Sequence, residues 1–178
     1  MKRLWVIGAI AAVIVIGIAA YFIVGEGPDQ REEAAPIAIQ ETIGDLAYEV
    51  HLDQDRFGLD DKIIVRTKIT NLGSEKLSYV SGSSSCPRHA DVNIAHEQSG
   101  TQLTNPSQIC TSDEVTSILE PGKAAEGEIE FLPEQWKGNK LVPAETGAYE
   151  VTVALPLNRE QIELKMKRET VKTTIVLE

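Results

Sequence analysis

The chain has 178 residues, of which 42% are hydrophobic and 25% are charged, and its formal net charge is −10. Without Lys2 and Arg3 it carries 15 basic and 27 acidic residues, a net charge of −12. Nucleic acids and anionic lipid surfaces bind clustered Lys and Arg side chains, so this balance argues against both as partners of the folded part.

Residues 4–24 form an uncharged hydrophobic run of 21 residues near the start of the chain. A helix of this length, rising about 1.5 Å per residue, would span the ~30 Å hydrocarbon core of a bilayer. Lys2 and Arg3 precede the run, and the next basic residue is Arg31. Because positively charged flanks stay in the cytoplasm, the sequence predicts a single-pass protein of the cell membrane. Its N-terminus would be cytoplasmic, and everything after residue 24 extracytoplasmic.

A cleaved signal peptide is the alternative interpretation of this run. Signal peptides have an apolar region of about 7–15 residues that ends at a small-x-small cleavage site. The run here is longer, and residues 21–26 provide no such site, although Ala19 and Ala20 are small. We therefore favour an uncleaved anchor, and both interpretations export the rest of the chain.

The remaining residues divide into a linker and one domain, which suits a chain of this length. Residues 25–36 are rich in Gly, Pro and charge, which is typical of an unstructured acidic tether. From residue 37 onward hydrophobic and polar residues alternate, the period of a half-buried strand. The sequence thus predicts a cytoplasmic stub and anchor (1–24), a linker (25–36) and an extracytoplasmic domain (37–178). The predicted strands lie within residues 46–52, 63–70, 77–79, 92–94, 115–119, 129–131, 149–155, 162–166 and 171–177.

Eight or nine short strands separated by turns, with no amphipathic helix after the anchor, predict an all-β fold. The alternation requires each strand to bury one face, as two packed antiparallel sheets of a β-sandwich do. Between two strands, Pro121 and Gly122 suit the central positions of a type II turn, since Gly accepts positive φ. Trp136 is predicted to be buried in the core, with an exposed binding aromatic as the alternative.

Cys86 and Cys110 are the two cysteines of the chain. Outside the cytoplasm paired thiols oxidise, so the sequence predicts a disulfide between them. Closing this loop of 25 residues would stabilise the fold by roughly 3–4 kcal/mol if the gain comes from chain entropy.

Several stretches resemble known extracellular and inhibitor modules. Residues 67–77, with Thr70 and Asn71 before a turn of small residues, resemble a signature of immunoglobulin-like domains. Residues 119–123, Trp136 and residues 142–151 are similar, in this order, to the intracellular proteinase inhibitor (BsuPI-type) domain.

The resemblance covers roughly residues 48–155 and implies an immunoglobulin-like antiparallel β-sandwich. It also raises the hypothesis of a proteinase inhibitor-like domain at the cell surface, although no inhibitory residues can be carried over. The chain departs from the family in its export anchor, its two cysteines and an insertion at residues 144–146.

Residues 53–61 begin like a calcium-binding loop and contain the carboxylates Asp53, Asp55, Asp60 and Asp61. An EF-hand is excluded because Ile64 stands where a bidentate Glu is needed. A looser calcium site remains an alternative, and a solvated hairpin loop is the preferred interpretation.

Cys86, His89, His96 and Cys110 are residue types that bind zinc or copper. A disulfide would remove both thiolates, so we predict neither a metal nor a cofactor. The serines of residues 81–86 lack a Gly-x-Ser-x-Gly elbow and a recognisable base, so we predict no catalytic activity.

The sequence therefore predicts an interaction module for an unknown extracytoplasmic protein or ligand. Loops on a rigid sandwich are where such folds bind, and the loop of residues 82–91, joined to Cys110, is the best candidate. A proteinase inhibitor is the second hypothesis, and an enzyme or metal carrier the third. The predicted interaction residues are Ser83, Ser84, Ser85, Pro87, Arg88 and His89.

Overall fold

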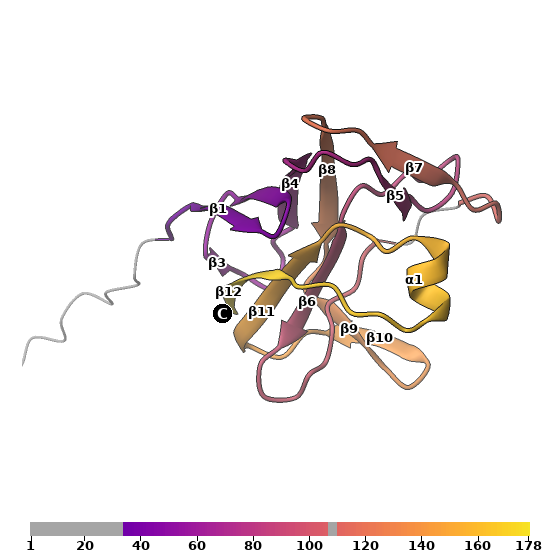
Figure 1. Cartoon of the computed structure of the whole chain (residues 1–178). Coiled ribbons are helices and arrows are strands. Elements are labelled where there is room, and N and C mark those ends of the chain that lie inside the picture. The colour runs from indigo at the N-terminus through magenta and orange to yellow at the C-terminus, as the bar shows by residue number, and fades with distance from the viewer. Residues whose placement is uncertain (1–33, 107–109) are drawn as a thin grey trace, which may run out of the picture. The chain divides into compact units, whose positions relative to one another are not determined.

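The folded part of the chain is built almost entirely from β-strands, as the alternation predicts (Figure 1). The computed structural model describes residues 34–106 and 110–178. The predicted anchor and most of the predicted linker lie outside these residues. No helix within the described ranges is long and apolar enough to cross a bilayer.

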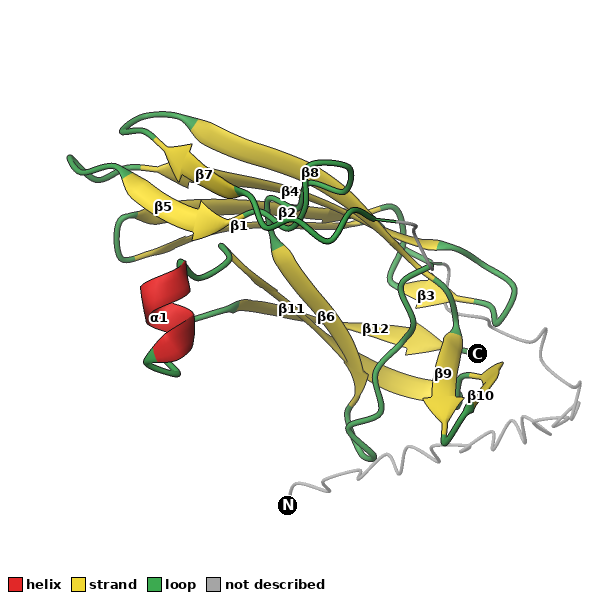
Figure 2. Cartoon of the chain, turned by 90° about the vertical axis from the view of Figure 1, so that its right-hand side faces the viewer, coloured by secondary structure: helices red, strands yellow, loops and turns green. Residues whose placement is uncertain are grey.

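Two four-stranded sheets lie over one another as separate layers (Figure 2). All neighbouring strands are antiparallel except β3 and β12, which run parallel. The first sheet contains, in spatial order, β1 (Ile37–Ile43), β2 (Leu46–Leu52), β4 (Ile63–Asn71) and β8 (Ala124–Phe131). The second contains β3 (Arg56–Phe57), β12 (Val171–Leu177), β11 (Gly147–Ala154) and β6 (Asp91–His96). Two strand pairs complete the described part: β5 (Leu77–Val80) with β7 (Thr116–Leu119), and β9 (Glu134–Lys137) with β10 (Lys140–Pro143).

The core lies between the two layers and follows the period of two. Buried residues alternate with partly exposed ones along β2, β4 and β11. Burying one large apolar side chain stabilises the fold by about 1.5–3 kcal/mol, so these strands supply much of the driving force. The predicted all-β, sandwich-like fold with antiparallel sheets is confirmed. The largest fully buried side chains include Tyr48, Leu52, Ile63, Ile69, Tyr149 and Ile175.

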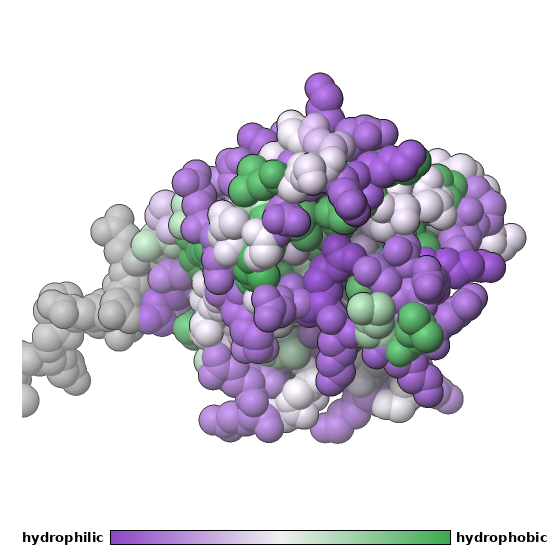
Figure 3. All heavy atoms as spheres, viewed as in Figure 1, coloured by the Kyte–Doolittle hydropathy of each residue, from purple (hydrophilic) through white to green (hydrophobic). Residues whose placement is uncertain are grey.

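The molecular surface is mainly hydrophilic on the face that Figure 3 shows, in keeping with the acidic composition. A hydrophobic patch lies near the short helix α1 (Arg159–Glu163). Ile162, Leu164 and Met166 of this region each have about half or more of their surface exposed.

The predicted strand at residues 162–166 is therefore wrong. Asn158 accepts a hydrogen bond from the backbone N–H of Gln161 (2.8 Å), and the Gln161 side chain accepts one from the Asn158 N–H (3.0 Å). This capping box begins α1. No strand lies beside the segment to pair with it, so the alternating residues stay exposed.

The predicted turn after β7 is confirmed. Gly122 has a φ of +72°, and the Lys123 N–H donates to the carbonyl of Glu120 at 3.0 Å. Both features are expected of a type II turn with Pro and Gly in the centre.

Asn71, at the end of β4, holds three segments together. Its Nδ2 donates to the carbonyls of Glu75 (2.7 Å) and Leu119 (3.0 Å), and its Oδ1 accepts from the N–H of Gly73 (2.9 Å). The residue is fully buried. The side chain thereby joins β4 and the following turn to the end of β7.

We expect Asn71→Ala to lower the free energy of unfolding by about 3 kcal/mol, because buried polar groups lose their partners. Chemical denaturation of the full chain measures this change. Asn139→Ala, at an exposed turn position, serves as the control and should change stability by less than about 0.5 kcal/mol. A loss no larger for Asn71→Ala than for the control would contradict this role.

Candidate functional site

The candidate site lies along one open side of the sandwich, where β6 and β8 are the edge strands. Residues 101–106 run between these edges. The Leu103 N–H donates to the carbonyl of Ile94 in β6, and the Leu132 N–H, just after β8, donates to the carbonyl of Thr104, both at 2.9 Å. This segment covers only part of the open side, so hollows remain along it.

Three hollows follow this segment, and Asn105 lines all of them. The loop hollow, of about 590 Å³, lies beneath the loop 82–91. The central hollow, of about 420 Å³, lies between Asp91 of β6 and Ile129 of β8. The Trp136 hollow, of about 490 Å³, lies where Trp136 meets residues 101–105.

The loop 82–91 is shaped by a glycine and by its own backbone hydrogen bonds. Gly82 has a φ of +83°, and a Cβ at this position would lie 2.8 Å from the carbonyl oxygen of Cys86. The Arg88 N–H donates to the carbonyl of Ser81 (2.7 Å) and the Cys86 N–H to that of Ser83 (3.2 Å). Any side chain at residue 82 would strain the backbone and displace Cys86.

The predicted disulfide between Cys86 and Cys110 is confirmed, with Cα atoms 5.6 Å apart. Hydrogen bonds tie the same segments together: the Thr111 N–H donates to Ser85 Oγ (2.8 Å), and the Ser84 N–H to Asp113 Oδ2 (3.1 Å). Hydrogen bonds from Thr111 and Ser84 lower the pKa of the Asp113 carboxyl. The small residues of the loop are therefore pinned to the segment after Cys110.

Ser83 is one of the residues that line the loop hollow, and its buried hydroxyl has no hydrogen-bond partner in the described part of the chain. Only 7% of the residue is exposed. Leaving a buried hydroxyl unpaired costs free energy, and native proteins keep few such groups. A polar group of a bound ligand would satisfy this hydroxyl.

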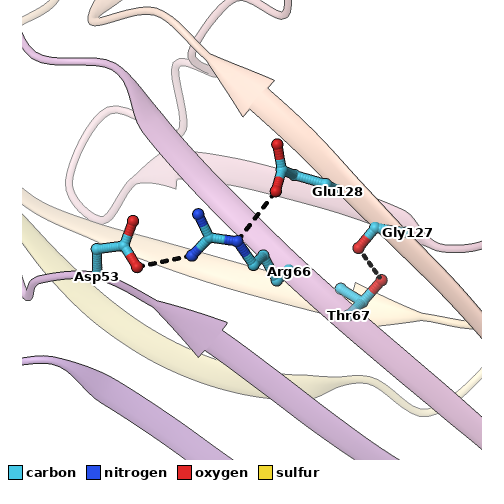
Figure 4. A network of polar contacts seen from close by, with 5 residues as sticks. All are labelled: Asp53, Arg66, Thr67, Gly127 and Glu128. Carbon is cyan, nitrogen blue, oxygen red and sulfur yellow. Dashed lines mark hydrogen bonds and ion pairs between the residues drawn. The ribbon is translucent and has the colours of Figure 1, made fainter.

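Four carboxylates line the loop hollow, and three of them have cationic partners, whereas Asp113 accepts hydrogen bonds from Ser84 and Thr111. Glu128 accepts a hydrogen bond from Arg66 Nε at 3.0 Å, and the same guanidinium reaches Asp53 at 2.6 Å (Figure 4). Glu130 pairs with Lys62 at 2.8 Å, and Glu114 with Arg159 at 3.0 Å.

Arg88 forms no comparable ion pair with a carboxylate of the described residues. It lines the loop hollow, the central hollow and a further small hollow beside α1. Within residues 34–106 and 110–178, its exposed guanidinium forms neither an ion pair nor a side-chain hydrogen bond. A cation at a junction of hollows, where three of the four carboxylates of the loop hollow are already paired, is suited to a carboxylate or another anion.

Asp91, Arg168 and Arg88 are the charged residues that line the central hollow. Burial raises the pKa of Asp91, and the nearby Arg88 and Arg168 partly oppose this shift. Burial lowers the pKa of Arg168, whose Nη2 donates to Gln161 Oε1 at 3.0 Å. Arg88 and Arg168 thus share one carboxylate, which leaves this corner with more positive than negative charge.

The remaining sequence motifs do not assemble into metal sites. His89 Nδ1 lies 2.7 Å from the Tyr79 hydroxyl, whereas His96 Nδ1 contacts Ser99. Both cysteines are consumed by the disulfide. Across the described ranges, no three His, Cys, Asp or Glu side chains cluster in a way that could hold a metal ion.

Three of the four carboxylates of the calcium-like stretch have partners of their own. Asp53 pairs with Arg66, Asp55 accepts from the Ala35 N–H at 2.8 Å, and Asp61 from the Gly58 N–H at 2.7 Å. These contacts support the solvated-loop interpretation.

Trp136 is exposed, so the prediction that it is buried in the core is wrong. The residue has 59% of its surface accessible and lies on β9. Alternation along β9 places Gln135 toward the protein and Trp136 on the outer face. Its position agrees with the alternative interpretation of the sequence, in which Trp136 is an exposed aromatic side chain.

The structure brings most of the predicted interaction residues to one place. Ser83, Pro87, Arg88 and His89 line the loop hollow together with the disulfide. Ser84 and Ser85 instead hold the loop to Thr111 and Asp113. Sequence reasoning missed Asn105 and Arg168 and gave Trp136 a binding role only as the alternative, because only the folded chain brings these distant positions to the open side.

No family model and no curated protein matches the chain. Solved structures show distant likeness to it. A β-glucosidase from Erythrobacter marinus has 16% identity and a TM-score of 0.44 over 82% of this chain. A β-glucosidase from Listeria innocua has 10% identity and a TM-score of 0.42 over the same share. The chain spans only 16% of the length of these glucosidases.

The yjhA protein from Bacillus subtilis is similar over 79% of this chain and 96% of its own length, with 13% identity and a TM-score of 0.42. At such TM-scores none of these likenesses says anything about function.

Removing the disulfide should loosen the loop hollow and destabilise the fold. We expect the double variant Cys86→Ser, Cys110→Ser to lose roughly 3–4 kcal/mol of unfolding free energy. Urea denaturation of the full chain measures the loss. A reductant should reproduce it in the unmodified chain and have no effect on the double variant. Equal stability of the oxidised and reduced chain would refute the prediction.

Proposed function

We propose that this chain is a membrane-tethered, extracytoplasmic interaction module that binds a protein segment or ligand in the loop hollow and catalyses no reaction. The hydrophobic run of residues 4–24 supports the tether, and the disulfide agrees with an oxidising compartment. The hydroxyl of Ser83 carries the proposal of a binding site, because it is buried and has no hydrogen-bond partner among the described residues.

The charge around this hydroxyl favours a partner with an acidic group. Three of the four carboxylates that line the loop hollow, Glu114, Glu128 and Glu130, are paired with cations. Arg88 forms no ion pair with the described residues and shares the nearby Asp91 with Arg168. An arginine offers two parallel N–H donors to a carboxylate, which gives direction as well as attraction. A carboxylate bound to Arg88 would place a second polar group of the partner near Ser83.

The hydrogen bonds of the site support binding rather than catalysis. A serine nucleophile needs a base within hydrogen-bond reach. The Ser83 hydroxyl has no such neighbour in the described part, and His89 Nδ1 is engaged with Tyr79. The oxygens of Ser84 and Ser85 contact Thr111.

The finer fold assignment is part of this proposal. An immunoglobulin-type sandwich is supported by the Tyr149 hydroxyl, which donates to the carbonyl of Glu145, four residues earlier, at 2.7 Å. A tyrosine near the start of a strand makes the same backward contact at a corner of many such sandwiches.

The proteinase inhibitor hypothesis rests on the BsuPI-type resemblance alone. Adding the full chain to serine proteases tests it, because an inhibitor would reduce their activity stoichiometrically.

Ser83→Ala separates a binding role from a structural one. The substitution removes a buried unpaired hydroxyl, so it should leave stability unchanged or raise it by up to about 1 kcal/mol. If the hydroxyl serves a partner, the same variant should bind that partner more weakly. A loss of stability with undiminished binding would show that Ser83 has only a structural role.

A photo-crosslinking amino acid in place of Pro87 should capture the partner in intact cells. The same amino acid in place of the exposed Glu41, on the edge strand β1, is the matched control and should not capture it. Adding Arg88→Ala should reduce the Pro87 cross-link several-fold, and Arg88→Lys should reduce it less. Capture from residue 41 but not from residue 87 would place the interaction surface elsewhere.

A further inference from the structure

The β9–β10 hairpin presents an aromatic face. In sequence, the hairpin is far from the predicted interaction loop. Trp136 on β9 lies opposite Leu141 on β10, and both side chains are exposed, by 59% and 42%. The hairpin is joined to residues 101–106 by the Thr104 N–H, which donates to the carbonyl of Glu134 at 2.8 Å. The indole therefore forms one wall of the Trp136 hollow, and the segment 101–105 forms the other.

The lining of this hollow carries no charged side chain, although a quarter of all residues in the chain are charged. Besides Trp136, the wall consists of Thr101, Gln102, Leu103, Thr104 and Asn105.

Two side-chain amides of this wall are available to a ligand. The Thr104 hydroxyl, by contrast, is buried and has no hydrogen-bond partner in the described part of the chain. Gln102 and Asn105 are exposed, and their amides form no hydrogen bond with other described residues. Each amide offers two N–H donors and one carbonyl acceptor, so it can bind a hydroxyl in either role.

The lysines of the hairpin do not belong to this surface. Side chains alternate between the two faces of a strand, so Lys137 and Lys140 lie on the face opposite Trp136 and Leu141. Glu134 shares the Trp136 face but is not part of the hollow. An anionic ligand such as a phosphate would find no cation here, and a charged peptide would find no partner for its charge.

We propose that the Trp136 hollow is a binding site for a neutral saccharide. One face of a pyranose ring carries C–H groups, which are apolar and slightly positive, and the face of an indole is apolar and electron-rich. The hydroxyls around the rim of the sugar need donors and acceptors, which the exposed amides of Gln102 and Asn105 supply. A hollow with one aromatic wall and a few neutral polar groups matches this chemistry, and a volume of about 490 Å³ accommodates a small ligand.

The test uses the full chain in phosphatidylcholine nanodiscs, because alkyl-glycoside detergents would compete for a sugar site. Trp5→Phe leaves Trp136 as the only tryptophan, so its fluorescence reports on the hollow alone. Cellohexaose, chitohexaose and maltohexaose are titrated to millimolar concentration. At least one should shift this fluorescence saturably, and calorimetry on the chain with both tryptophans should give the same affinity.

In calorimetry, Trp136→Ala should weaken saccharide binding at least about tenfold, and Trp136→Phe should weaken it less because a ring remains. Asn105→Ala should also weaken it. Ile118→Ala removes an equally exposed apolar side chain on β7 and should have no effect.

The saccharide proposal is overturned if none of the three oligosaccharides binds, or if Trp136→Ala binds them as well as the unmodified chain. It also fails if Trp136→Ala abolishes the cross-link from Pro87 while no sugar binds, because the indole would then contact a protein partner. Loss of the Pro87 cross-link in Arg88→Ala, with sugar binding intact, would leave this proposal standing independently of the loop hollow.

Discussion

A sandwich of two open sheets must leave edge strands unpaired. The candidate site of this protein follows from the way in which one pair of edge strands is only partly covered. β6 ends one sheet and β8 ends the other on the same side. Unpaired edges expose backbone groups that attract other strands. Residues 101–106 satisfy some of these groups by bonding to β6 and to the end of β8. Because one extended segment cannot cover the whole opening, the hollows remain along it, with Asn105 in the wall of each.

The loop hollow depends on two further constraints that act on backbone rather than on side-chain packing. The positive φ of Gly82 lets the chain turn back close to Cys86, and the disulfide fixes that turn to residue 110. Hydrogen bonds from the N–H groups of Ser84 and Thr111 add to this connection. A rigid loop presents Arg88 at little entropic cost, since the ordering of the loop is already provided by folding.

The sequence predicts the buried layers well because their signal is local. Tyr48, Ile69 and Tyr149 stand in regular alternation, and each is buried where the period of two places it. The same signal misleads at Leu164, where alternation occurs without a neighbouring strand, and the capping box that begins at Asn158 decides the local structure instead. The exposure of Trp136 could not be predicted, because it depends on which side of β9 faces the core. The candidate site was only half predictable for a related reason: the cysteines identify the loop, but its opposite wall comes from distant residues.

The proposed membrane tether lowers the affinity that binding in these open hollows requires. A linker of the 12 residues 25–36 extends at most about 40 Å, so an anchored domain would stay within that distance of the bilayer. A partner held in the same membrane, or a polymer lying against it, would then meet the site at a high effective concentration. Shallow hollows with a few well-placed groups, such as Arg88 or Trp136, would suffice under these conditions, whereas a freely diffusing receptor would need a more enclosed pocket. Within the described residues the Ser83 hydroxyl is unsatisfied, at a cost of about 1 kcal/mol, and a fold secured by its core and its disulfide can retain it.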